Sequence, residues 1–236
     1  MTALKLDARP PVIAIVGAFN PAIFNPLWVA HHLHGFPKGA EVTMLEAMAE
    51  VPGGLAPLTF IEGVALTVSA SRLDAIVLSH EAPRLAALEK VLIKLVEVLP
   101  HTPLRGLGCN LQFVDDDPSD TLLAFFNSPE GIEGDFTTHD RQFSVQLDIE
   151  GGILNFNRAE INGTVRFGFN YHYSPSEPEE YAAIIPDLVN KSREHASKLL
   201  AALYGLNEFE TISYMKISEQ EAVGVETANP IVESNH

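Results

Sequence analysis

The chain has 236 residues, of which 46% are hydrophobic and 19% are charged, and its 31 acidic against 15 basic side chains give a formal net charge of −16. This composition is typical of a soluble globular protein, and the length suits one large domain or two small ones. The longest apolar run, residues 12–19, is shorter than the roughly 20 residues that cross a bilayer, so no membrane span is expected. The single cysteine excludes an intramolecular disulfide and a multi-cysteine zinc site. The first eleven residues show no secretory signal, and we expect a cytoplasmic protein.

The acidic residues gather in the second half, where 19 acidic and 7 basic residues follow Pro118. Sequence-independent binding to nucleic acid requires clustered Lys and Arg that neutralise phosphates, and the sequence has no such cluster. Direct nucleic-acid binding is therefore not expected. The opposite role, an acidic inhibitor that mimics DNA in the basic cleft of another protein, stays open as an alternative.

The first half is predicted to run strand, short helix, three strands, long helix. Residues 12–16 form an apolar run typical of a buried strand, and Asn25 followed by Pro26 is a typical start of a short helix. Three strands are expected next, over residues 41–47, 58–70 and 73–78. Apolar residues at three- and four-residue steps over 85–99 then predict a long helix, for which Ser79 is a candidate cap.

The second half repeats this order. Residues 105–114 alternate apolar and polar side chains, as expected of a strand, and Ser119 is a candidate cap of a short helix. Three antiparallel strands follow, because Gly151-Gly152 and Asn162-Gly163 are both signals of two-residue hairpin turns.

A long helix is expected to close the second half. Ser176 and Glu179 have the spacing of a capping box, and Gly205 is suited to end the helix. Pro186 is expected to kink this helix or to delay its start.

The two halves therefore predict an α+β fold with an internal duplication that forms a pseudo-dimer. The expected parts are a first half over residues 1–101, a second half over 102–206, and a third part over 207–236 that comprises a last strand, residues 209–217, and a flexible acidic tail. The seam between the halves is a natural place for a pocket or a partner surface.

Counting from the two turns predicts the register and the two faces of the second three-stranded meander. It places Ile149 opposite Leu154, Leu147 opposite Phe156, Phe156 opposite Phe169 and Leu154 opposite Tyr171. One face is then apolar and is expected to be core: Phe143, Val145, Leu147, Ile149, Leu154, Phe156, Val165, Phe167, Phe169 and Tyr171. On this face Arg158 and Glu160 are expected to form an ion pair at the rim of the core.

The other face of the meander is rich in amides, which are uncommon on a merely solvated sheet. It supplies the candidate residues for binding a protein partner or a small polar ligand: Asp148, Asn155, Asn157, Arg166, Asn170 and His172. A plain solvated face of an antiparallel sheet is the competing interpretation.

The segment VIAIVGAFNP, residues 12–21, resembles the opening of the nucleotidyltransferases that carry a histidine-containing signature after such a turn. In that family, histidines after the Phe-Asn-Pro step contact the nucleotide phosphates. The matching positions here are Ile23 and Pro26, whose side chains cannot donate a hydrogen bond. The segment is therefore interpreted as a strand and a turn rather than as a nucleotide site.

Two further groups invite a chemical interpretation. His31, His32 and His34 cluster near the end of the first short helix, but the carboxylate of the HExxH motif does not follow, and complementing the helix dipole explains them without a metal. Cys109 stands among the apolar positions of its strand, which favours a buried, inert thiol. No catalytic residue, metal ligand or cofactor is assigned.

The leading hypothesis is a non-catalytic binding or assembly module that recognises a protein or a polar ligand through its sheet face or through the seam between its halves. The first alternative is an enzyme that acts on a small polar molecule in that seam, with Asp148, Arg158, Glu160 or His172 as acid, base or anchor. The acidic inhibitor is the second.

Overall fold

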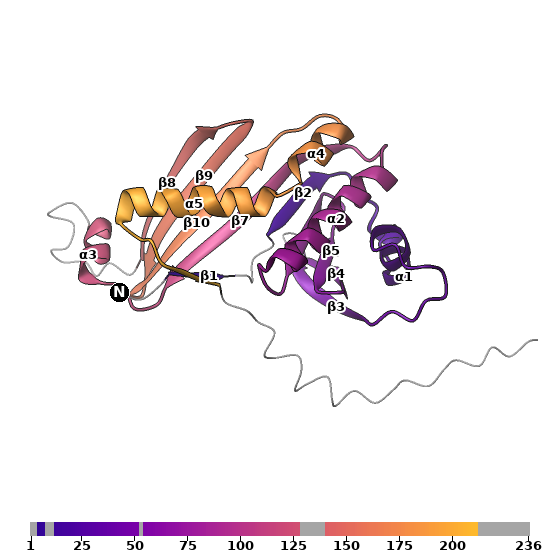
Figure 1. Ribbon diagram of the computed structural model, residues 1–236, viewed down its shortest axis with the longest axis horizontal. Coiled ribbons are helices and arrows are strands. Elements are labelled where there is room, and N and C mark those ends of the chain that lie inside the picture. The colour runs from indigo at the N-terminus through magenta and orange to yellow at the C-terminus, as the bar shows by residue number, and fades with distance from the viewer. Residues whose placement is uncertain (1–3, 8–11, 52–53, 128–139, 212–236) are drawn as a thin grey trace, which may run out of the picture.

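The computed structural model describes residues 4–7, 12–51, 54–127 and 140–211 (Figure 1). These residues form an α+β fold with five α-helices and one sheet of eleven strands, in which all pairs but one are antiparallel. The predicted α+β class is confirmed. Within the described residues, no helix is both long and apolar enough to cross a membrane.

The elements of the first half include short helical turns besides strands and one long helix. They are β1 (Leu4–Asp7), β2 (Ile13–Gly17), the 3₁₀ turn η1 (Pro21–Ile23), α1 (Pro26–Trp28), the π-helix η2 (Val29–Leu33), β3 (Met44–Val51), β4 (Gly54–Ile61), β5 (Val64–Val68), β6 (Arg72–Val77) and α2 (Ala82–Val98).

The second half contributes the longest strands. Its elements are β7 (Leu104–Asp115), α3 (Asp120–Leu123), the 3₁₀ turn η3 (Ala124–Phe126), β8 (Asp140–Ile149), β9 (Gly152–Ile161), β10 (Thr164–Tyr173), α4 (Pro178–Ile184), α5 (Leu188–Tyr204) and β11 (Phe209–Thr211).

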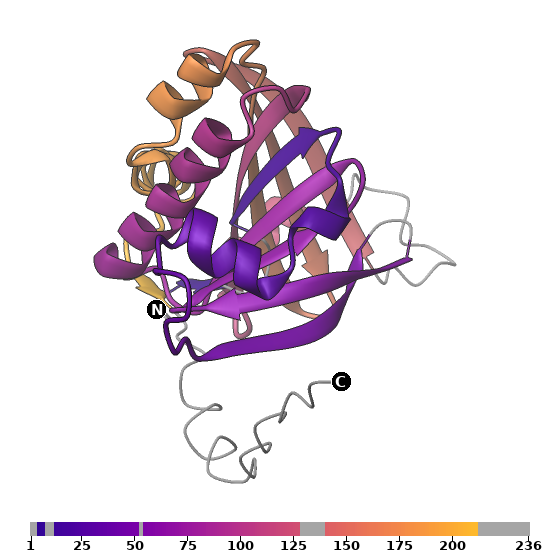
Figure 2. The same ribbon diagram turned by 90° about the vertical axis from the view of Figure 1, so that its right-hand side faces the viewer.

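The strands of both halves join in one sheet, in the order β3-β4-β5-β6-β2-β7-β10-β9-β8. β2 and β7, which open the two predicted halves, lie side by side and antiparallel in the middle. β1 pairs with β7 on one side and with β11 on the other. The long helices α2 and α5, with α4 between them in the chain, cover one face of the sheet (Figures 1 and 2). We call this face the helix face and the opposite one the open face.

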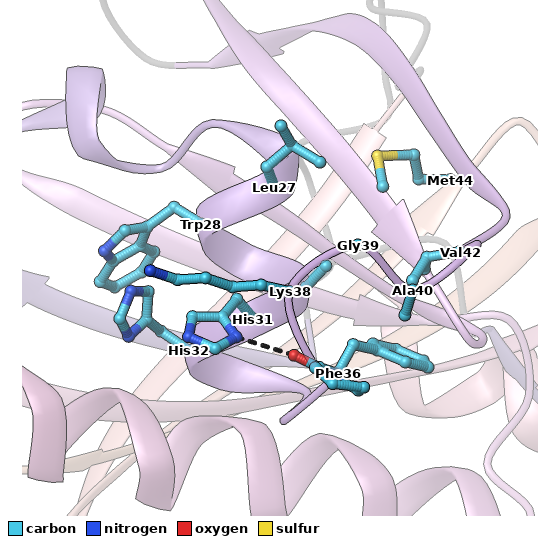
Figure 3. A pocket seen from close by; sticks show the side chains of 12 residues that line it. Leu27, Trp28, His31, His32, Phe36, Lys38, Gly39, Ala40, Val42 and Met44 are labelled. Carbon is cyan, nitrogen blue, oxygen red and sulfur yellow. Dashed lines mark hydrogen bonds between the residues drawn. The ribbon is translucent and has the colours of Figure 1, made fainter.

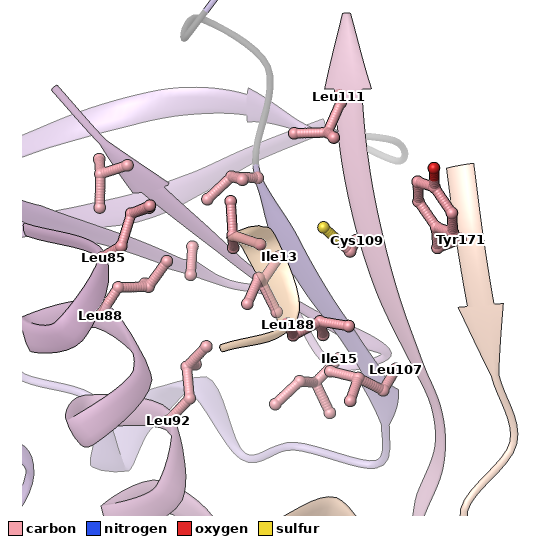
Figure 4. Packing of buried hydrophobic residues seen from close by; sticks show 14 of the residues in the cluster. Ile13, Ile15, Leu85, Leu88, Leu92, Leu107, Cys109, Leu111, Tyr171 and Leu188 are labelled. Carbon is pink, nitrogen blue, oxygen red and sulfur yellow. The ribbon is translucent and has the colours of Figure 1, made fainter. Parts of the chain in front are cut away.

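A single hydrophobic core fills the space under the helices and draws on both halves of the chain. Figure 4 shows Leu85, Leu88 and Leu92 of α2 and Leu188 of α5 with Ile13 and Ile15 of β2 and Leu107, Cys109 and Leu111 of β7. Each of these side chains is almost fully buried. Burial of one such leucine stabilises the fold by about 1.5–3 kcal/mol.

The turn between β9 and β10 has the predicted residues and the predicted register. Asn162 and Gly163 adopt φ values of 50° and 81°, as a type I′ turn requires. Phe156 pairs with Phe169 and Leu154 with Tyr171, so both predicted pairings are confirmed.

The turn between β8 and β9 lies one residue earlier than predicted. It comprises Glu150 and Gly151, because the positive φ of 72° falls on Gly151 while Gly152 already belongs to β9. Leu147 therefore pairs with Leu154 and Ile149 with Gly152, two positions away from the predicted register. A shift of two residues keeps every side chain on its predicted face.

The prediction of three strands after the first short helix is wrong, because residues 58–70 do not form one strand. β4 ends at Ile61 and β5 begins at Val64, and the turn between them places Glu62 at φ 49° and Gly63 at φ 84°. Few non-glycine residues adopt a positive φ, and Glu is not among those that favour it. The first half thus has four strands, β3 to β6, where the second half has three.

The helix starts agree with the sequence only in part. The amide N of Trp28 donates to Asn25 Oδ1 over 2.9 Å, and that of Leu122 donates to Ser119 Oγ over 3.3 Å, so both predicted caps are confirmed. Ser79 is not a cap, because α2 starts after Glu81. The capping box at α4 is formed by Glu177 and Glu180, one position after the predicted pair.

The closing helix of the second half is broken, as Pro186 predicted. α4 ends at Ile184 and α5 begins at Leu188, with Asp187 at φ 59° between them. β1 was not predicted. Of the predicted strand over residues 209–217, β11 accounts for the first three, and the rest of that strand and the predicted acidic tail lie outside the described residues.

Candidate functional site

The six candidate residues of the meander lie on the open face of the sheet. Asp148 comes from β8, and β9 contributes Asn155 and Asn157. The others, Arg166, Asn170 and His172, stand at alternate positions of β10. Alternate residues of a strand point to the same side, and on β9 and β10 most of the opposite set is buried under the helices.

Two of the six belong to a chain of side-chain amides that crosses four strands in one row. Gln146 Nε2 donates to Asn155 Oδ1 over 3.1 Å, and Asn155 Nδ2 donates to Asn170 Oδ1 over 3.0 Å. Asn170 Nδ2 in turn donates to Asn110 Oδ1 on β7 over 2.6 Å. We call these four residues the amide ladder. All its bonds point the same way, so each polarises the next and the row is held rigid.

The other four candidates are not brought together. Asp148 and His172 share a row, but Ile153 of β9 stands between them, which separates them by about 10 Å, two strand spacings. His172 lies over Gly106 of β7, where a Cβ atom would come within 3.0 Å of its Cε1. Arg166 and Asn157 are exposed. These four side chains therefore do not converge on one point of the open face.

The expected ion pair between Arg158 and Glu160 is not what the structure shows. Glu160 is bound by Arg141 of β8 across 3.1 Å. The guanidinium of Arg158 lies 4.6 Å from the ring centroid of Phe143 and donates to Tyr204 Oη over 2.8 Å. Both residues are on the helix face, so the sheet itself separates them from Asp148 and His172. The four residues named for an enzyme do not converge.

The helix face of β8 departs from the predicted core. Three of its side chains, here called the edge row, are 40% (Phe143), 49% (Val145) and 39% (Leu147) exposed, whereas Phe156 and Leu154, the β9 partners of Val145 and Leu147, are buried. The helices bury most of the corresponding side chains of β9 and β10 but leave these three side chains of the outermost strand partly exposed. Phe125 of η3 is also exposed, and its ring packs edge to face against that of Tyr204 of α5 at a centroid distance of 5.1 Å.

A cavity of about 360 Å³ opens beside α1 and the π-helix η2. One wall comes from Leu27, Trp28, His31 and His32, and the other comes from the segment between Phe36 and Met44 (Figure 3). We call it the π-helix cavity. Sequence patterns did not indicate it, because its two walls meet only in the folded chain and a π-helix has no recognised sequence signal.

The three clustered histidines face different neighbours. His31 Nδ1 lies 2.8 Å from the carbonyl oxygen of Phe36, and His32 packs on Trp28 with ring centroids 5.0 Å apart. His34 lies 3.9 Å from Glu62, and its burial lowers its pKa. In the described ranges, no group of three or more His, Cys, Asp or Glu side chains gathers around one point.

Cys109 is fully buried in β7, as predicted. Burial raises the pKa of its thiol to about 12, so it stays protonated and unreactive in the folded protein. The segment that resembles a nucleotidyltransferase opening is a strand followed by a capped turn, in which Asn20 Oδ1 accepts from the amide N of Ala22 over 3.2 Å.

Comparisons of the chain with protein-family models, with curated proteins and with solved structures found no match.

Proposed function

We propose that this protein is a non-catalytic assembly module, and that it assembles through the edge strand β8. The observation that carries the proposal is the edge row: three large apolar side chains, 39–49% exposed, on the outermost strand of the sheet. Among the described residues β8 pairs with β9 alone, so its outer backbone groups face away from the sheet. An edge of this kind is a template for another strand.

β8 lacks the features by which soluble proteins usually protect an edge. Its ten residues, DRQFSVQLDI, contain no Lys or Pro, and its pairing with β9 runs without a bulge. Its charged residues, Asp140, Arg141 and Asp148, stand near its ends. The strand at the opposite edge of the sheet, β3, carries Glu46 at the third of its eight positions, paired with Thr59 of β4.

A side chain on the open face also favours assembly through the β8 edge. The amide ladder ends at Gln146 on β8, and Gln146 uses its amide nitrogen toward the ladder. Its oxygen remains able to accept a hydrogen bond from a strand added beside β8. An added strand would thus meet apolar side chains on one face and a hydrogen-bond acceptor on the other.

The occupant that this edge fits best is β8 of a second copy. In an antiparallel pair centred on Val145, Phe143 faces Leu147 of the second copy, and Ser144 faces its Gln146, so that the serine hydroxyl can extend the ladder. This arrangement is a closed two-fold interface in which all of β8 except its first residue is paired. Like charges, Asp140 and Glu150, face each other only at the two ends.

We also propose that the two halves of the chain arose by internal duplication. In both halves the first strand lies at the centre of the sheet, the last strand of the meander lies next to it, and the earlier strands follow toward the edge. The two series are β2-β6-β5-β4-β3 and β7-β10-β9-β8. Each half then ends in a long helix on the same face. This order supports a pseudo-two-fold axis between β2 and β7, and the extra strand of the first half is the departure from it.

The test is the mass of the protein in solution over a concentration series, by light scattering and sedimentation. We expect the wild type to form a two-copy species and Val145→Lys to stay a single copy, because the two introduced ammonium groups would face each other. The exposed Asn157→Lys adds the same charge on β9 and should still pair. A wild type that remains a single copy at every concentration would contradict the proposal.

The register has its own test. Phe143→Glu and Leu147→Lys should each weaken self-association, and a mixture of the two variants should restore it, since the carboxylate introduced in one chain would face the ammonium group introduced in the other. Circular dichroism of each variant verifies that the fold is intact. If the mixture associates no better than either variant alone, the pairing about Val145 is wrong.

A further inference from the structure

The π-helix cavity is independent of the β8 edge, on the opposite half of the molecule. Its volume of about 360 Å³ lies within the range of about 300–1,000 Å³ that is usual for small-molecule sites. Figure 3 shows the side chains of helix and loop on either side of the opening.

The charge of its lining is opposite to that of the whole molecule. The chain has 31 acidic residues, but none of the twelve residues around the cavity is Asp or Glu. Lys38 is the charged residue among them, and His31 and His32 add two groups that can carry a proton. In a protein of net charge −16, such a lining favours a ligand with a negative charge.

The walls are flat and aromatic. The rings of Trp28 and His32 are 5.0 Å apart and tilted by 33°, and those of His31 and His32 meet edge to face at 4.7 Å. Phe36 stands on the loop side of the opening (Figure 3). Rings arranged in this way offer faces and edges to a planar ligand.

The hydrogen bond of His31 fixes how the imidazole can act. Its Nδ1 lies 2.8 Å from the carbonyl oxygen of Phe36, and because a carbonyl only accepts, Nδ1 must donate. In the neutral ring, Nε2 is then left as an acceptor, and in the charged ring it becomes a second donor. The same bond ties the loop to the helix and so holds the two walls at a fixed spacing.

The backbone of the inner wall is unusual as well. η2 is a π-helix over five residues, closed by a bond from the amide N of His34 to the oxygen of Val29 over 3.2 Å. π-Helical turns are rare and often lie at functional sites, because the extra residue redirects side chains at a cost in stability.

We propose that the π-helix cavity binds a small planar aromatic acid, with one or two rings and a carboxylate. The ring packs between Phe36 and the wall formed by Trp28 and His31, and the carboxylate pairs with the ammonium group of Lys38.

The chain provides its own probe, because Trp28 is its only tryptophan. The full-length protein is titrated with 2-naphthoate, with the uncharged 2-naphthamide and with the non-planar cyclohexanecarboxylate, by calorimetry and by Trp28 fluorescence. We expect saturable binding of 2-naphthoate, at least about tenfold tighter than that of either comparison compound.

Lys38→Gln should weaken the binding of 2-naphthoate about fivefold and leave that of 2-naphthamide unchanged, whereas Lys198→Gln on exposed α5 should change neither. Phe36→Leu should weaken both aromatic compounds. The proposal is overturned if 2-naphthoate neither releases heat nor changes Trp28 emission, if 2-naphthamide binds equally well, or if Lys38→Gln has no effect.

Discussion

His80 shows how a single buried side chain makes the stability of this protein depend on pH. It is 4% exposed, and among the described residues neither of its ring nitrogens has a hydrogen-bond partner. Burial, with a smaller contribution from the charge of Arg193, lowers its pKa to about 4. In the unfolded chain the pKa returns to about 6.5, so below that pH the unfolded state binds a proton that the folded state refuses.

The free energy of unfolding should therefore fall as the pH drops from about 6.5 to about 4, by an amount on the order of 3 kcal/mol from this residue. Replacing the histidine with an apolar side chain, His80→Leu, should remove this part of the pH dependence. Urea unfolding at several pH values in that window measures it. His101→Gln at an exposed position is the control and should keep the wild-type slope, and equal slopes for all three proteins would contradict the assignment.

At the scale of elements, the turn at Asn162-Gly163 sets the register of the meander that carries the amide ladder. Gly163 has φ 81°, and a Cβ atom added there would have no neighbour within 4 Å. Gly163→Ala should therefore lower the free energy of unfolding by about 1–2 kcal/mol, through backbone strain alone.

Gly168→Ala is the matched control for that variant. Gly168 lies in the middle of β10 without a positive φ, and its added Cβ would meet Asn157 Cβ at an ordinary 3.7 Å. Thermal and urea unfolding should find it as stable as the wild type or slightly more so. Equal losses for both variants would show that packing, not the φ angle, governs these positions.

The same turn explains why much of the second half could be predicted from sequence. Asn-Gly favours positive φ at both positions, so Asn162-Gly163 determined the register of β9 and β10 and the face on which Asn155 and Asn170 lie. Glu150-Gly151-Gly152 offered two turns, and the sequence does not distinguish them. Glu62 adopts a conformation that its residue type disfavours, so the division between β4 and β5 carried no signal.

The candidate surfaces, too, could be predicted from the sequence only in part. Alternation predicted which side chains share the open face, but the amide ladder needed Asn110, a β7 residue that pairs with β10 only in the folded sheet. Exposure of Val145 could not be predicted, because it depends on the position of β8 at the edge of the folded sheet and on how the helices pack over that sheet. The π-helix cavity depends on a contact between His31 and Phe36 and on an irregular helix.

At the scale of the whole molecule, net charge opposes the proposed assembly. Each copy carries a formal charge of −16, and Asp140 and Glu150 would meet their like at the ends of the paired strands. Added salt screens such repulsion over distances of about 10 Å at 0.1 M. Self-association should accordingly strengthen between about 20 and about 500 mM NaCl, measured by sedimentation. Weakening by salt would instead indicate that attraction between opposite charges holds the copies together.

The central position of β7 has a consequence for how the chain acquires its structure. β2 pairs with β6 on one side, but its other neighbour, β7, is synthesised only after α2 is complete. In a nascent chain that has folded as far as α2, β2 would be an unpaired edge of the sheet. The apolar side chains that β7 and α5 later cover would still be exposed to solvent. Closing the sheet then joins residues far apart in sequence, which slows folding. The protein is therefore most prone to aggregation and to capture by chaperones after α2 has been synthesised and before β7 pairs with β2.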